Sequence, residues 1–156
     1  MAVSKACVRM AGIRLSLGMI LALLIVPGFV IPPVLFSKLD THTAGMVAGS
    51  IFHISNLGIL LLSASVAAFW MRLSSLGWLN WTLLGVIVVL VCANEFAIAP
   101  VMQSLKDTAG DISALAKDDP QKIQFGILHG ISEIVHLLAS IMAVVLVAFG
   151  GDRKKT

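Results

Sequence analysis

Charged residues are scarce in this 156-residue chain, and their scarcity limits what the protein can be. They make up 12% of the sequence, whereas hydrophobic residues make up 58%. A soluble domain of ordinary composition carries about 25% charged residues. The chain therefore has too little polar surface to face water on all sides, and we expect most of its surface to face a lipid bilayer.

Cysteines and recognisable catalytic motifs are also scarce or missing. The sequence has two cysteines, Cys7 near the N-terminus and Cys92 within an apolar run, so no disulfide framework is expected. It has no glycine-rich phosphate loop and no arrangement typical of a catalytic triad. The net charge of +3 comes from basic residues that flank apolar runs, so nucleic-acid binding is not expected. Whether the protein is an enzyme stays open.

Four long apolar runs account for nearly the whole chain. A helix needs about 20 apolar residues to cross a bilayer. The runs cover residues 11–36, 44–71, 78–103 and 123–149. The sequence therefore predicts an all-α fold, a four-helix transmembrane bundle that forms a single integral membrane domain over residues 1–156.

Lysine and arginine are distributed unevenly around these runs. Seven of them fall on the side that holds both chain ends: Lys5, Arg9, Arg14, Arg72, Arg153, Lys154 and Lys155. Basic residues on the other side are offset by aspartates. Cytoplasmic flanks of membrane helices carry the excess of Lys and Arg. We therefore expect the N and C termini to be cytoplasmic.

The first and third runs repeat each other at an offset of 67 residues. Over positions 17–41, 11 of 25 residues are identical to their counterparts, including a proline, a serine, an aspartate and a threonine. The second and fourth runs open alike, with Ile51-x-His53 and Ile127-x-His129. We predict two repeated helical hairpins related by an axis along the membrane normal. His53 and His129 then occupy equivalent positions that can face each other across this axis.

Prolines and glycines are expected to shape the bundle. Four prolines lie in the outer halves of the first and third runs: Pro27, Pro32, Pro33 and Pro100. A missing backbone donor bends a helix at such positions. Four glycines are expected to let neighbouring helices approach closely: Gly49, Gly58, Gly126 and Gly130.

A few ionisable side chains lie within the apolar runs, and any functional interpretation depends on them. On a helical wheel His129, Glu133 and His136 fall within about 60° of one another, which predicts a shared face. The second and third runs contribute His53 and Glu95. These residues are expected about 9–15 Å from the outer ends of the runs, with His136 near the midplane. No lysine or arginine lies in the outer halves, so each glutamate should meet a metal ion, a protonated histidine or its own proton.

These five residues form a candidate metal site. Imidazole and carboxylate ligands suit copper, zinc or iron. Glu133-x-x-His136 has the spacing with which helix bundles present di-iron ligands, although the full di-iron pattern needs a second such pair. The two facing histidines of the repeat could instead bind haem axially. Asn56, Asn94 and Ser132 would support the ligands by hydrogen bonds, or hold helices together if no metal binds.

Two segments have the pattern of a known family. One is GFVIPPVLFSKL at 28–39, and the other is FGILHGIS at 125–132, preceded by Asn94 and Pro100. Both resemble the transmembrane protein 205-like family, which implies a four-helix membrane fold among bacterial proteins of unknown function. Three residues that depart from the family pattern add potential ligands: His53, Glu133 and His136.

The sequence leaves three functions open for what we expect to be a multi-pass protein of the bacterial inner membrane. The first is binding of a metal ion, or of haem, for metal handling or redox chemistry, with the chain alone or as a subunit of a larger membrane complex. The second is a non-catalytic structural or assembly subunit, with other membrane subunits or further copies as partners. The third is a proton-coupled carrier of small solutes in which Glu95 and Glu133 titrate.

Overall fold

The computed structural model describes residues 5–72 and 77–149, and all regular elements in these ranges are helical. Within them, four helical spans are long and apolar enough to cross a membrane: Cys7–Lys38, Thr41–Trp70, Trp78–Ala109 and Pro120–Phe149. We refer to them as the first to fourth spans. The prediction of an all-α protein with four membrane-spanning helices is confirmed.

The first and third spans are each built from three consecutive helical segments. The first contains α1 (Lys5–Ile25), the π-helical segment η1 (Val26–Val30) and α2 (Ile31–Lys38). The third contains α4 (Trp78–Ala93), the π-helical segment η2 (Asn94–Ile98) and α5 (Ala99–Ala109).

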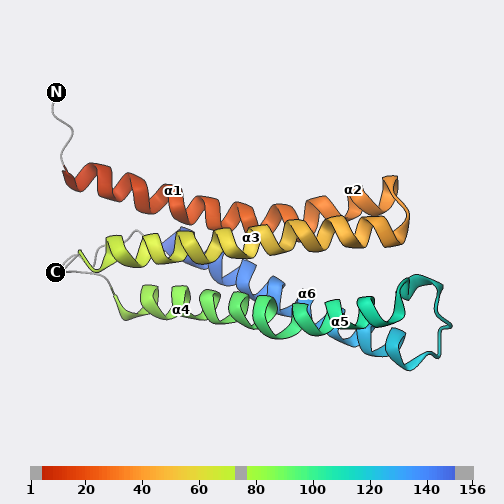
Figure 1. The fold of residues 1–156 in the computed structure, drawn as a ribbon. Helices are drawn as coiled ribbons and strands as arrows, with labels where there is room; N and C mark the ends of the chain where they lie inside the picture. The colour runs from red at the N-terminus through yellow and green to blue at the C-terminus, as the bar shows by residue number, and fades with distance from the viewer. Residues whose placement is uncertain (1–4, 73–76, 150–156) are drawn as a thin grey trace.

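The second and fourth spans are single helices, α3 (Thr41–Trp70) and α6 (Pro120–Phe149). A short 3-10 turn, η3 (Ile112–Ala114), lies in the connection between α5 and α6. Side by side, α1 and α3 form one hairpin with α2, and α4, α5 and α6 form the other (Figure 1).

The helices extend beyond the apolar runs at one end of the bundle. The sequence predicts that the third helix ends at residue 103, but α5 continues to Ala109, and α6 begins at Pro120 rather than at 123. Local signals set these ends: Gly110 follows α5 with a φ of 70°, and the side chain of Asp40 caps α3 by accepting a hydrogen bond from the Thr43 N–H at 2.9 Å. Apolarity reports contact with lipid, whereas capping residues report where a helix stops.

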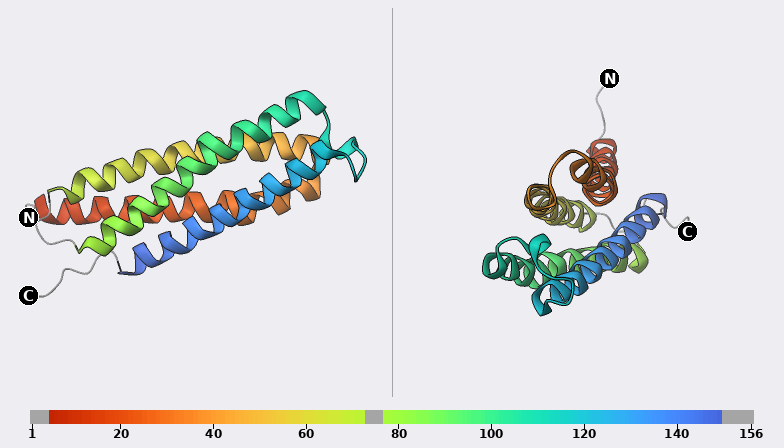
Figure 2. Two further views of the ribbon diagram at one scale, coloured as in Figure 1. Left: turned by 90° about the horizontal axis from the view of Figure 1, so that it is seen from below. Right: turned by 90° about the vertical axis from the view of Figure 1, so that its right-hand side faces the viewer.

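The four spans pack as a ring in which each contacts the next. α1 contacts α3, α3 contacts α4, α4 contacts α6, and α6 returns to α1, so α3 and α6 lie diagonally across the ring. The start of α1 and the end of α6 lie at one end of the bundle, the terminal end (Figure 1). The opposite end carries the connections 39–40 and 110–119, and we call it the loop end. Figure 2 shows the ring from the loop end in its right-hand view.

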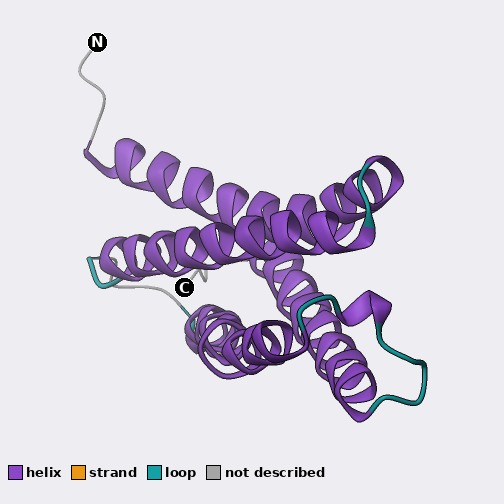
Figure 3. Cartoon of the chain, turned by 45° about the vertical axis from the view of Figure 1, so that its right-hand side comes forward, coloured by secondary structure: helices purple, strands orange, loops and turns teal. Residues whose placement is uncertain are grey.

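The buried apolar core lies in the terminal half of the bundle. Its side chains come from all four spans: Ile13, Leu17, Ile20, Leu24, Ile59, Val66, Trp70, Leu83, Leu84, Ile87, Val91, Ala139, Ala143 and Leu146. By contrast, α2 and α5 bury no residue. The two hairpins diverge toward the loop end, as Figures 1 and 3 show. Apolar packing therefore joins the hairpins mainly on the terminal side.

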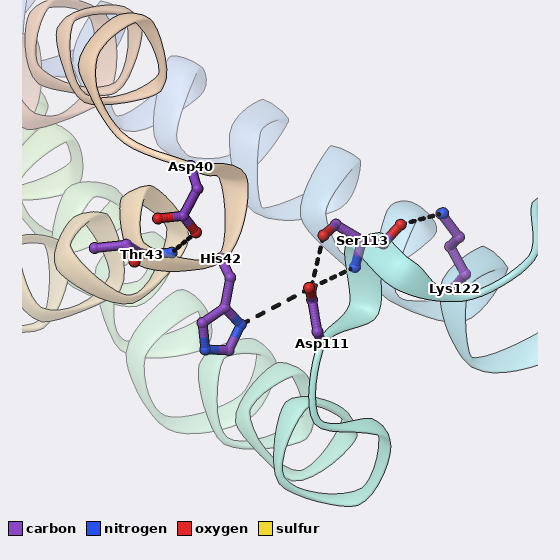
Figure 4. A network of polar contacts seen from close by, with 6 residues as sticks. All are labelled: Asp40, His42, Thr43, Asp111, Ser113 and Lys122. Carbon is purple, nitrogen blue, oxygen red and sulfur yellow. Dashed lines mark hydrogen bonds and ion pairs between the residues drawn. The ribbon is translucent and has the colours of Figure 1, made fainter.

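Polar contacts join the two hairpins at the loop end (Figure 4). His42 on α3 places its Nδ1 3.9 Å from Oδ1 of Asp111 in the connection before α6. The same oxygen accepts hydrogen bonds from the N–H of Ser113 at 2.9 Å and from its hydroxyl at 2.6 Å. Lys122 donates to the carbonyl of Ser113 at 3.0 Å. These hydrogen bonds fix the connection against α3 and α6.

Candidate functional site

A π-helical segment of five residues interrupts both the first and the third span. In η1 the N–H of Ile31 donates to the carbonyl of Val26, and in η2 the N–H of Ala99 donates to the carbonyl of Asn94. Pro27 lies within η1 and has no N–H to donate. Such segments insert a residue into a helix and are frequent at functional sites. They locate a candidate site near the middle of the bundle.

Glu95 in η2 is a buried carboxylate with two polar partners on α3. It is 7% exposed. Its Oε1 contacts Nδ1 of His53, and its Oε2 accepts a hydrogen bond from Nδ2 of Asn56 at 2.9 Å. The contact with the imidazole requires one shared proton. Among the partners that the sequence predicts for this glutamate, the structure supplies a histidine, and Nε2 of His53 has no contact among the described residues.

Asn94, the neighbour of Glu95 in η2, contacts the fourth span. Its Oδ1 accepts a hydrogen bond from the hydroxyl of Ser132 on α6 at 2.7 Å. Asn94 and Glu95 are both buried, so η2 directs two adjacent polar side chains toward two different neighbouring spans. This is the helix-holding role that the sequence predicts as one alternative for Asn94 and Ser132.

His136 joins the fourth span to the first. Its Nε2–H donates to the carbonyl of Leu24 at 2.7 Å, and the residue is 7% exposed. Phe52 packs edge-on against the imidazole, with ring centroids 5.2 Å apart. The space beside His136 that Asn56 and Asn94 also line has no room for a water molecule. His136 is therefore held in a tight, polar part of the interior.

These contacts form a polar belt that connects all four spans. Its members are His53, Asn56, Asn94, Glu95, Ser132, His136 and the carbonyl of Leu24. The spans have 30–32 residues. At about 1.5 Å per residue, the belt lies about 18–24 Å from the loop end of spans about 45–48 Å long. The depth of about 9–15 Å expected from the sequence is too shallow for these residues, because the helices begin farther out than the apolar runs.

His129 and Glu133 lie outside the belt, on the outer surface of α6. Nε2 of His129 is 3.2 Å from Oε1 of Glu133, and the two side chains are 57% and 70% exposed. The prediction that they share a face with His136 is wrong, because His136 points into the core. A helical wheel fixes relative angles only, and the buried face of α6 is marked by Ala139 and Ala143, three and seven residues after His136.

The five predicted ligands thus fall into two imidazole–carboxylate pairs and the separate His136. In the part of the chain that the structure describes, no group of three or more His, Cys, Asp or Glu side chains is placed to hold a metal ion. His53 and His129 lie on the diagonal helices α3 and α6, and each contacts its own carboxylate. These residues of one chain do not form a single five-ligand site, and metal or haem binding stays a prediction.

The predicted role of the glycines holds for one of the four. A Cβ on Gly58 would lie 3.2 Å from Cδ1 of Leu23, which is a close helix contact. Gly49, Gly126 and Gly130 have no atom within 4 Å of their Cβ positions. The prediction of close packing within the chain is wrong for these three, which open onto the outer surface of α3 and α6.

Sequence reasoning missed one glycine of the belt and its carbonyl partner. Gly28 in η1 lies against the ring of His136, and the carbonyl of Leu24 accepts the hydrogen bond from that ring. A glycine directly after Pro27, inside an apolar run, is the signal in the sequence that could have indicated a close approach.

The fold and the belt define the class of this protein: a multi-pass helical membrane protein with a buried polar layer. The sequence profile of a family described as a domain of unknown function (DUF4149) matches residues 15–111, and the chain belongs to this family. The match includes His53 and Glu95 and ends before α6. A search of curated proteins gave no match, and neither did a search of solved structures.

Proposed function

We propose that the chain is a non-catalytic subunit of a membrane assembly and contacts another integral membrane protein through the outer surface of α6. The pair of His129 and Glu133 carries this proposal. Both side chains are exposed. At about 1.5 Å per residue, they lie about 14–20 Å from the loop end of α6, a depth at which hydrocarbon rather than water surrounds the bundle.

An ionisable pair that faces hydrocarbon at this depth is costly. Insertion scales assign about 2.5–3.5 kcal/mol to a charged residue at the centre of a membrane helix. Such residues nearly always face a bundle interior or a polar partner. Glu95 follows this rule through His53 and Asn56. His129 and Glu133 have no further polar partner in the described chain, and a polar group on a neighbouring protein would remove much of the cost.

The expected orientation of the assembly places the terminal end of the bundle in the cytoplasm of a bacterial cell. Arg9, Arg14 and Arg72 lie toward this end and support that orientation. Three more basic residues assigned to the same side lie outside the described residues: Arg153, Lys154 and Lys155.

Two observations support the finer family and repeat assignments. The paired segments η1 and η2 occur at nearly equivalent places in the two hairpins, as expected for an internal duplication. The motifs at 28–39 and 125–132 support a relationship to the transmembrane protein 205-like family.

Native mass spectrometry after purification in a mild detergent tests the proposed function. The wild-type chain should be released as an assembly, and a variant carrying His129→Leu and Glu133→Leu should be released as a single chain with unchanged helical circular dichroism. Ile134→Leu, an exposed apolar position next to Glu133, is the matched control and should keep the assembly. A wild-type chain that is a stable monomer, or a double variant that stays assembled, would contradict the proposal.

Metal binding is a second candidate function, and one contact favours it. A carboxylate on one ring nitrogen of a histidine orients the other nitrogen toward a metal ion, and Glu95 holds His53 in this way. The remaining ligands would have to come from a neighbouring protein. Iron, copper and zinc per chain can be measured on the purified assembly. Near-stoichiometric metal that is lost in His53→Ala supports this function, and absence of metal after loading excludes it.

A further inference from the structure

We infer that the protein covering α6 is a second copy of this chain, and that the outer surface of α6 packs against the outer surface of α3 of that copy. The inference rests on the proposed assembly function and names its partner. It depends on two helix surfaces, each of which combines small residues with one ionisable side chain.

The first surface is a stripe on α6, formed by Gly126, Gly130, Glu133 and Leu137. Their spacing of four, three and four residues places them along one side of the helix. No atom lies within 4 Å of the Cβ positions of the two glycines, and the Glu133 side chain is 70% exposed. Nothing in the described chain covers the glycines of this stripe.

The second surface is a stripe on α3, formed by Gly45, Gly49, His53 and Leu57. Each residue follows the previous one by four positions, so they also share one side of a helix. Gly45 and Gly49 have no atom within 4 Å of their Cβ positions, and the His53 side chain is 60% exposed. Pairs of small residues four positions apart let the backbones of membrane helices approach closely.

The two stripes match in direction, depth and charge. Both α3 and α6 begin at the loop end, so they would pack in parallel. At about 1.5 Å per residue, the glycines of both stripes lie about 6–15 Å from that end, and His53 and Glu133 both lie about 18–20 Å from it. The free Nε2 of His53 in one copy therefore meets the carboxylate of Glu133 in the next.

The ring of spans determines the kind of assembly. Because α3 and α6 are diagonal, the two stripes lie on different sides of one chain, and their contact is head-to-tail. Head-to-tail contacts generate closed rings when the rotation between copies closes. A two-fold contact between two α6 helices would place the Glu133 carboxylates opposite each other, like against like, without the imidazole of His53.

Disulfide cross-linking in membranes tests this contact. Two differently tagged copies are co-expressed, one with Gly49→Cys and the other with Gly130→Cys, both with Cys7→Ser and Cys92→Ser. Mild oxidation should link the two tags, and neither variant expressed alone should cross-link. Val89→Cys, at an exposed position on α4, replaces Gly49→Cys as the control and should not link to Gly130→Cys.

A second measurement guards against an unfavourable cysteine geometry. Gly49→Leu fills the open space on α3 and should convert the assembly to single chains, whereas Gly85→Leu, at a position equally open on α4, should not. Self-linking of Gly130→Cys, or an assembly that survives Gly49→Leu, would overturn the inference. An assembly made with a different protein would overturn it while leaving the proposed function intact, and a monomeric wild-type chain would overturn both.

Discussion

The imidazole of His136 occupies the space where a side chain of Gly28 would begin. A Cβ on Gly28 would lie 2.6 Å from Cδ2 of His136 and closer still to Nε2. Because Gly28 has no side chain, α6 approaches η1 closely enough for Nε2 to reach the carbonyl of Leu24 at 2.7 Å. This approach connects the first span to the fourth within the polar belt.

Gly28→Ala should destabilise the bundle by displacing the ring of His136. Overpacking of this kind typically costs about 1–3 kcal/mol. The hydrogen bond to Leu24 would weaken as well, so we expect a lower unfolding temperature in detergent. Gly18→Ala on α1 is the matched control, because nothing lies within 4 Å of its Cβ position. Equal unfolding temperatures for the two variants would show that the ring of His136 is not confined.

The contact between Asn94 and Ser132 should give a measurable coupling energy. Hydrogen bonds between membrane helices contribute about 0.6 kcal/mol on average, and about 1.7 kcal/mol at most. A double-mutant cycle with Asn94→Ala and Ser132→Ala should fall in this range. A second cycle pairs Asn94→Ala with Ser65→Ala, whose hydroxyl bonds within its own helix to Leu61, and its energies should add. Additivity in both cycles would remove the Asn94–Ser132 contact from the belt.

The loop end should lose order as the pH falls. Hydrogen bonds from Thr43 lower the pKa of Asp40, and those from Ser113 lower the pKa of Asp111. A lowered pKa in the folded state means that the ionised carboxylate stabilises the fold above its usual pKa of about 4, and that this stabilisation is lost as the pH falls through the lowered value. Hydrogen-exchange protection of the Thr43 and Ser113 amides should therefore decrease in acid.

Asp40→Asn is the control for this pH dependence. Asparagine caps a helix about as well as aspartate but does not titrate in this range. Protection of Thr43 should become independent of pH in this variant, while Ser113 keeps its acid response through Asp111. An unchanged acid response at Thr43 would exclude the Asp40 cap as its cause.

The sequence was sufficient to predict the four spans, because runs of apolar residues of this length have few alternatives in a membrane protein. It was less informative about where the helices end. Ser104 and Asp107 are polar, yet α5 continues past both, because the backbone hydrogen bonds of a helix do not require apolar side chains. The stop at Gly110 was written in the sequence as a glycine after a lysine-containing turn.

The candidate site was predictable by residue type but not by arrangement. His53, Glu95 and His136 were singled out as buried ionisable residues, and Glu95 and His136 are buried. Which carboxylate meets which imidazole depends on the π-helical segments, which shift the register of the side chains that follow. The exposure of Glu133 depends on the rotation of α6 in the bundle, which the helical wheel of α6 alone does not fix.

Lipid exposure of the α6 stripe is the most direct test of the central claim that another protein covers it. Leu137 and Leu138 are adjacent, are 45% and 44% exposed, and lie at nearly the same depth, but only Leu137 follows Glu133 on the stripe. Each can be replaced by cysteine in a background with Cys7→Ser and Cys92→Ser and then spin-labelled in lipid bilayers. We predict much lower oxygen accessibility at 137 than at 138, because protein covers one side and lipid the other. Equal, high accessibility at both positions would mean that lipid surrounds α6, and it would contradict the account.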